Sequence, residues 1–207
     1  MKHYNFSVPL YSKEQIYVAM QTKEIVASLV ASAFQIDVDI AKTEIVSHSK
    51  WGWRERILLN LAIKTKNGLA MADAAVFVCD NSEACACCRT YLVHVPEEIQ
   101  YFRHGDLLVD FSRELYGITL CLEKCPEMPA AFYRMYKYDD EWEEDDIFQE
   151  IDDGMHEVQV NLAYLVPNAP VDIQDFLNVI GGAQPKTELG KKFLRVAGPI
   201  DRRGPSC

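Results

Sequence analysis

Hydrophobic and polar residues alternate most regularly in the stretch before Asn67-Gly68. Only Leu58 breaks the polar side of that alternation, whose apolar positions are Ile57, Leu59, Leu61 and Ile63. A period of two residues is typical of a strand with one buried face. Asn67-Gly68 is a preferred pair for a type I′ turn, and it predicts a hairpin. The predicted register pairs Lys66 with Leu69, Ile63 with Ala72, Leu61 with Ala74, Leu59 with Val76 and Ile57 with Val78. A slip of one residue would turn the apolar side chains to the other face.

Helical periodicity appears near both ends of the chain. Ser12 with Gln15 matches the capping-box pattern, and an apolar stripe follows from Ile16 to Phe34, with a break expected near Gln21-Thr22. Towards the other end, four apolar residues recur with helical spacing, between Pro170 and Gly181-Gly182: Ile173, Phe176, Leu177 and Ile180. Proline near the start and glycine just past the end are typical helix boundaries.

The remaining patterns are extended. Residues 37–47, Thr90–Val95 before Pro96, the stretch around Ile118–Leu122, and residues 157–166 each resemble strands. Strands grouped between terminal helices predict an α+β fold. We therefore expect a mostly antiparallel sheet of about five strands, with N-terminal and C-terminal helices packed on one face. Residues 1–197 would form a single domain, and residues 198–207 an irregular C-terminal tail.

Charge is distributed unevenly along the chain. The net charge is −10, yet residues 139–157, the acidic segment, hold eleven carboxylates and no Lys or Arg. The remainder holds 20 acidic and 21 basic residues, which leaves it nearly neutral. Nonspecific binding to nucleic acid depends on neutralising phosphates with basic groups, so such binding is disfavoured, at least at this segment.

The acidic segment is the first candidate binding site. Its apolar residues Ile147, Phe148, Ile151 and Met155 would share one side of a helix that Gly154 ends. A solvated helix face or a loop is the plain interpretation. The functional interpretation is a docking surface for a basic protein, as in inhibitors, immunity proteins or accessory proteins, because a dense carboxylate field accelerates encounter with a cationic partner. The predicted contact residues are Asp139, Asp140, Glu141, Trp142, Glu143, Glu144, Asp145, Asp146 and Glu150.

Basic residues suggest an alternative, a self-assembling structural protein such as a viral matrix-type component. Aromatic and basic side chains combine before the hairpin, at Trp51, Trp53, Arg54 and Arg56. Most such mixtures simply cover a sheet edge. The C-terminal stretch from Lys186 carries a net charge of +4. If the acidic segment of one copy met either basic stretch of the next, the contact would be heterologous and generate open assemblies, so a homo-oligomer is an alternative expectation.

Seven cysteines suggest a further alternative, a zinc-supported regulatory domain. The candidate ligands are Cys79, Cys85, Cys87, Cys88, Cys121 and Cys125. Their spacing lacks the paired C-x2-C knuckles of zinc ribbons and fingers, and Cys79 and Cys121 fall at strand positions. We therefore expect structural, reduced thiols and no cofactor, with zinc as the alternative.

Enzyme signatures are absent from the sequence. There is no Walker A run, GxGxxG, GxSxG, HExxH or kinase set. The N-terminus has no apolar run of the signal-peptide kind, and the longest apolar helical stretch, residues 25–34, is about half of what a bilayer requires. We expect a non-enzymatic protein in the cytoplasm or nucleus, without a membrane span.

Overall fold

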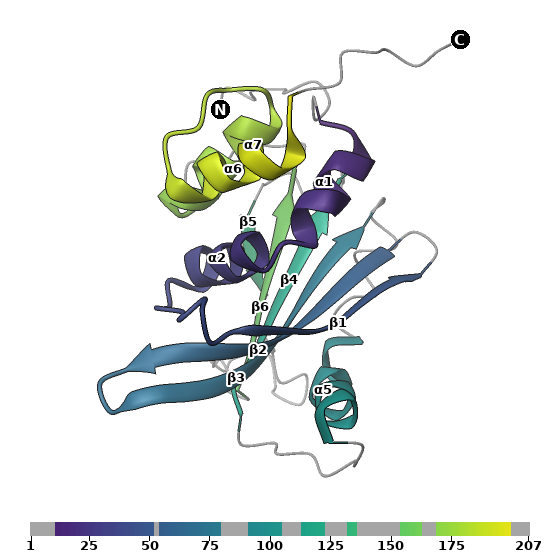
Figure 1. The fold of residues 1–207 in the computed structure, drawn as a ribbon, viewed down its shortest axis with the longest axis vertical. Helices are drawn as coiled ribbons and strands as arrows, with labels where there is room; N and C mark the ends of the chain where they lie inside the picture. Colours follow the sequence, from purple (N-terminus) through teal and green to yellow (C-terminus); the bar gives the residue numbers. More distant parts are fainter. Residues whose placement is uncertain are drawn as a thin grey trace, which may run out of the picture.

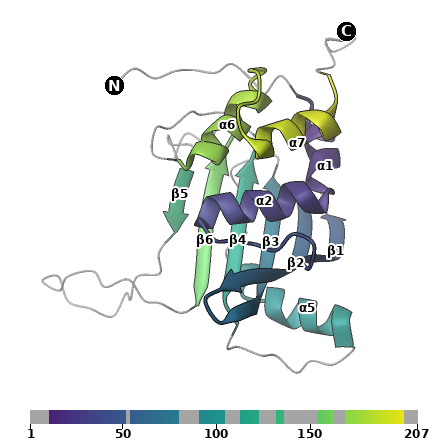
Figure 2. The same ribbon diagram turned by 60° about the vertical axis from the view of Figure 1, so that its left-hand side comes forward.

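The fold is a mixed sheet with helices on both faces (Figures 1 and 2). The computed structural model describes residues 11–51, 54–79, 91–104, 113–122, 132–135, 154–162 and 169–199. The described helices are α1 (Lys13–Met20), α2 (Lys23–Phe34), α5 (Val95–His104), α6 (Val171–Ile180) and α7 (Glu188–Ala197). The strands are β1 (Glu44–Trp51), β2 (Arg54–Thr65), β3 (Gly68–Cys79), β4 (Leu115–Cys121), β5 (Phe132–Met135) and β6 (Met155–Asn161).

The α+β class is confirmed, but the prediction of a mostly antiparallel sheet is wrong. The six strands lie in the order β1-β2-β3-β4-β6-β5, and β3, β4 and β6 are parallel neighbours. Strand β6 enters between β4 and β5, and pairs antiparallel with β5. Alternating apolar residues report which face of a strand is buried, but they do not report strand direction. The sequence pattern could therefore not distinguish these crossovers from hairpins.

The β2–β3 hairpin is confirmed, with a register two residues from the predicted one. Thr65 pairs with Gly68, and Ile63 pairs with Ala70 instead of Ala72. Positive φ occurs at Gly68 (122°) and not at Asn67, so the turn residues are Lys66 and Asn67 and the turn is not type I′. A shift of two residues keeps every side chain on its predicted face. The prediction of one wholly apolar face therefore survives the error in register.

Four helices cover one face of the sheet. Helix α1 begins at the predicted capping box, in which Gln15 N donates to Ser12 Oγ and Ser12 N donates to Gln15 Oε1. The expected break separates α1 from α2 at Gln21-Thr22. Helix α6 matches its prediction as well. Together with α7, these helices bury the apolar side of β2, β3, β4 and β6 in the main hydrophobic core.

Helix α5 covers part of the opposite face (Figure 1), where the sequence predicted a strand at Thr90–Val95. That prediction is wrong, since Tyr91 and Leu92 are helical and Val95 begins α5. Pro96 does not end a strand here. It lies in the first turn of a helix, where its missing N–H costs nothing. The second core beneath α5 consists of Leu58, Ala75, Phe77, Cys79, Leu92, Val95, Ile99, Leu115 and Cys121.

Helix α7 was not predicted, and a buried carboxylate of α6 holds its start. Asp175 is only 4% exposed. Its carboxylate accepts hydrogen bonds from Lys186 N at 3.0 Å, from Thr187 N at 2.8 Å and from Thr187 Oγ1 at 2.9 Å. Thr187 is the N-cap of α7 and accepts a hydrogen bond from Gly190 N. The connection between the two helices is thus fixed by one side chain from the core.

Candidate functional site

The acidic segment is attached to one end of the sheet. It lies in the connection from Met135, the last residue of β5, to Gly154, just before β6. Met135 pairs with Glu157 in the antiparallel β5–β6 ladder, so the connection leaves and re-enters the sheet at the same end, where β4 and β6 begin. All nine predicted contact residues lie outside the described residues, namely Asp139, Asp140, Glu141, Trp142, Glu143, Glu144, Asp145, Asp146 and Glu150.

The last carboxylate of the acidic segment belongs to the sheet and not to an exposed surface. Glu157 is 3% exposed. It lies on the α5 side of β6, the side opposite Val158 and the main core. Met155 is also a strand residue and packs against the second core, so the helix side predicted to include it does not extend that far. Gly154, just before β6, has a φ of 71°, a left-handed conformation that glycine adopts without strain. The carboxylates of the acidic segment that do not belong to β6 are therefore those of residues 139–153.

The described part of the chain is electrically balanced. It contains 15 Lys and Arg and 14 Asp and Glu, a net charge of +1. Residues 136–153 contain ten carboxylates and one cation, Lys137, a net charge of −9. Four described cations already form ion pairs with described carboxylates: Arg56 with Glu98, Lys64 with Asp37, Arg113 with Asp73 and Lys191 with Glu188. Nearly all of the protein's net negative charge thus resides in a single connection.

Helix α7 and the residue just before its N-cap carry four of the six cations of the basic C-terminal stretch. We name Lys186, Lys191, Lys192 and Arg195 the α7 basic face. Lys186, Lys191 and Arg195 are exposed, and Lys192 Nζ donates to Ser28 Oγ of α2 at 3.2 Å. Helices α6 and α7 lie towards the end of the sheet where β4 and β6 finish (Figure 2). The α7 basic face and the attachment of the acidic segment are therefore at opposite ends of the sheet.

The predicted self-association residues are divided between β1 and β2. Trp53 lies outside the described residues. Trp51 ends β1 and pairs with Arg54 of β2. Arg56 Nη1 donates to Glu98 Oε1 of α5 at 2.7 Å, and its side chain is 24% exposed. Its charge is thus countered within the molecule, which weakens the interpretation of this stretch as a free basic surface.

Two of the six candidate zinc ligands lie within the described residues. Cys79 and Cys121 are register partners at the ends of β3 and β4, and both are buried in the second core. Cys85, Cys87, Cys88 and Cys125 lie outside the described residues. No group of three or more potential ligands occurs within the described ranges.

A histidine–glutamate pair that the sequence patterns did not single out lies at the β1 edge. His48 Nε2 and Glu55 Oε1 are 2.7 Å apart, and Gln21 Nε2 donates to the same oxygen at 3.4 Å. Glu55 is 2% exposed, and its Oε2 accepts no hydrogen bond from the described residues. A buried carboxylate that holds one nitrogen of a half-exposed imidazole fixes the ring's tautomer and orientation. The β1–β2 pairing is the signal that could have found it, since it brings His48 within reach of Glu55.

A second histidine is held by an aromatic group at the start of β4 and β6. His156 stacks on Tyr116 with ring centroids 4.9 Å apart, and its Nε2 lies 2.6 Å from Glu114 Oε2. Phe34 meets both rings edge-on. Burial, and secondarily the negative charge of Glu114, raise the pKa of the Tyr116 phenol above its ordinary value of 10.0. The group anchors the first residues of β6 beneath α2.

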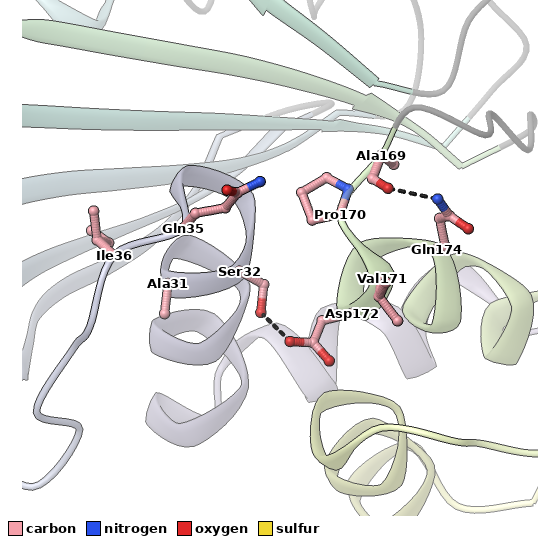
Figure 3. A pocket seen from close by; sticks show the side chains of 9 residues that line it. All are labelled: Ala31, Ser32, Gln35, Ile36, Ala169, Pro170, Val171, Asp172 and Gln174. Atoms are coloured by element: carbon pink, nitrogen blue, oxygen red, sulfur yellow. Dashed lines mark hydrogen bonds between the residues drawn. The ribbon is translucent and has the colours of Figure 1, made fainter.

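A cavity of about 680 Å³ lies between the end of α2 and the start of α6 (Figure 3). Two of its polar side chains satisfy each other, since Ser32 Oγ donates to Asp172 Oδ2 at 3.3 Å. Gln174 Nε2 donates to the carbonyl of Ala169 at 2.6 Å. Of the described residues that line the cavity, only Asp172 is ionisable.

None of the helices within the described ranges is long and apolar enough to cross a membrane. Comparisons of the chain with family models, with curated proteins and with solved structures give no match.

Proposed function

We propose that this chain is a non-enzymatic protein that binds a basic partner protein through residues 139–153 of the acidic segment. The observation that carries the proposal is the contrast between a described body of net charge +1 and a single connection of net charge −9. Such a field raises the encounter rate with a cationic protein surface and opposes encounter with anionic surfaces.

Attachment to the sheet supports a docking role for this connection. Both of its ends join neighbouring antiparallel strands, β5 and β6. The two ends of the connection are thereby tethered to the same end of the sheet, and at physiological salt charges further apart than the screening length of about 8 Å are largely screened from one another. Trp142, within the same connection, would supply the apolar anchor that protein interfaces commonly place among charged residues.

The test compares three baits in affinity capture from the native host. The first bait is the unaltered chain, and the second neutralises Asp140, Glu143, Glu144 and Asp146 by replacement with Asn or Gln. The third is a control with the same charge change in the described body, at exposed glutamates that make no side-chain hydrogen bond there: Glu14, Glu24, Glu44 and Glu97. We expect the first and third baits to capture the same basic protein and the second to lose it.

Calorimetric titration with the purified partner then measures the affinity. We expect it to fall at least tenfold in the second variant and to decrease as salt is raised, since the contacts are electrostatic. Circular dichroism and urea unfolding establish that all three baits are folded. Undiminished binding by the second variant would refute the proposal.

A further inference from the structure

The cations on the surface of α7 act on a glutamate of the same surface. Glu188 lies on this surface and is exposed, yet its pKa is lowered, first by a hydrogen bond from Lys191 and then by the charges of Lys191, Lys192 and Arg195. The side chains of Lys186 and Arg195 make no hydrogen bond or ion pair within the described part of the chain. The four cations exceed Glu188 by a charge of +3.

The α7 basic face and the acidic segment are poorly placed to meet within one molecule. Strand β6, with seven residues, separates their two ends of the sheet by roughly 20 Å along its own length. The connection 136–153 must leave and return to the same end, so each half reaches about 30 Å only when fully extended. Holding both halves extended across the molecule costs conformational entropy. An acidic segment from a second molecule can approach the α7 basic face without crossing this distance and without an extended connection.

We propose that the α7 basic face receives residues 139–153 of a second copy of this chain, so that the protein associates head to tail. This inference rests on the proposed function and assigns the basic surface of the partner to the α7 basic face of another copy. The contact is heterologous, because the two surfaces that meet are different. Each head-to-tail dimer as a whole keeps one unused acidic segment and one unused α7 basic face, so association continues beyond the dimer unless a ring closes.

Two variants separate the two halves of the contact. The acid-neutral variant replaces Asp140, Glu143, Glu144 and Asp146 with Asn or Gln. The base-reversed variant is Lys186→Glu with Arg195→Glu, which breaks no side-chain hydrogen bond or ion pair of the described residues. The matched control reverses two exposed lysines near the β2–β3 hairpin and the β1 start, Lys66→Glu with Lys42→Glu.

Light scattering after size-exclusion chromatography gives the mass of each sample at low and high salt. We expect the unaltered chain and the control to exceed the mass of a dimer at low salt and to return to the monomer mass at high salt. Each variant alone should be a monomer. An equimolar mixture should form a 1:1 dimer and nothing larger, because it offers one intact acidic segment and one intact α7 basic face.

Three results would overturn the inference: a monomeric unaltered chain at low salt, a mixture that fails to dimerise, or a control that loses association as the base-reversed variant does. The proposed function is judged separately. A chain that never self-associates but still captures a basic protein through residues 139–153 refutes the second copy alone. A chain whose acid-neutral variant captures that protein undiminished refutes the proposed function.

Discussion

The Asp175→Asn substitution should destabilise the fold because it places an amide donor where a buried carboxylate oxygen now accepts a hydrogen bond. The Lys186 N–H donates to both oxygens of the Asp175 carboxylate at 3.0 Å, and Thr187 N and Oγ1 donate to its Oδ2. An amide can keep its oxygen towards Thr187 only by placing its NH2 group 3.0 Å from the Lys186 N–H. Two donors then face each other at a residue that is 4% exposed.

The expected cost follows from the value of such hydrogen bonds. A hydrogen bond to a charged group contributes about 1.5–3 kcal/mol, and an unsatisfied buried donor costs about 1–3 kcal/mol. Since the two losses overlap and the site can relax, we expect Asp175→Asn to lose about 2–3 kcal/mol. That is a large share of the roughly 5–15 kcal/mol that stabilises a domain. At about 2–4 °C per kcal/mol for a chain of this length, Tm should fall by roughly 4–12 °C.

Urea unfolding followed by tryptophan fluorescence measures this loss as a lower midpoint with an unchanged slope. Asp37→Asn is the matched control. Its side chain is 69% exposed in an ion pair with Lys64, and it should change stability by less than about 0.5 kcal/mol. If Asp175→Asn costs no more than Asp37→Asn, the carboxylate does not hold the α6–α7 connection and the reasoning is refuted.

Three further changes test other local features. Gly190→Ala should lower the free energy of unfolding in urea by about 1–3 kcal/mol, because the alanine Cβ would lie 2.4 Å from Asp175 Oδ2. This cost outweighs the helix propensity of alanine. A neutral or stabilising effect would contradict that packing. Gly68→Ala should cost about 1 kcal/mol because Gly68 has a φ of 122°, while Asn67→Ala should be nearly neutral. A larger loss of stability for Asn67→Ala than for Gly68→Ala would contradict this turn geometry. Tyr116 should ionise above pH 10.0 in absorbance titration, and Glu114→Gln should lower its pKa, whereas an unchanged titration would contradict the contribution of Glu114. Since folding raises the Tyr116 pKa, its contribution to stability is present below pH 10.0 and is lost as pH rises through the folded value.

The sequence predicted well the elements whose boundaries are determined by residues close together in the chain. Ser12 and Gln15 cap α1 as expected, because a capping box needs only four consecutive residues. Helix α6 likewise begins and ends at its proline and glycines. The hairpin error came from assigning the positive φ to Asn67 as well as to Gly68, which moved the turn without moving the faces.

Other features depend on contacts distant in sequence. Leu58 looked like an exception to the β2 alternation, but it belongs to the core beneath α5. The apolar residues Leu92, Val95 and Ile99 show helical spacing towards that core, yet the short run before Pro96 resembled a strand. The His48–Glu55 pair similarly requires knowledge of how β1 pairs with β2. At the candidate site, the sequence predicted the charge itself, and the structure added its attachment between β5 and β6.

The position of β6 imposes an order on how this chain can be assembled. Strand β5 is made before β6, but its partner within the sheet is β6, which also pairs with β4. A growing chain that stops short of residue 154 therefore presents an open edge on β4 and leaves β5 without its ladder, and open strand edges are templates for aggregation. The most highly charged stretch of the protein is synthesised between those two strands, so like-charge repulsion among incomplete chains is greatest at the stage when their edges are exposed.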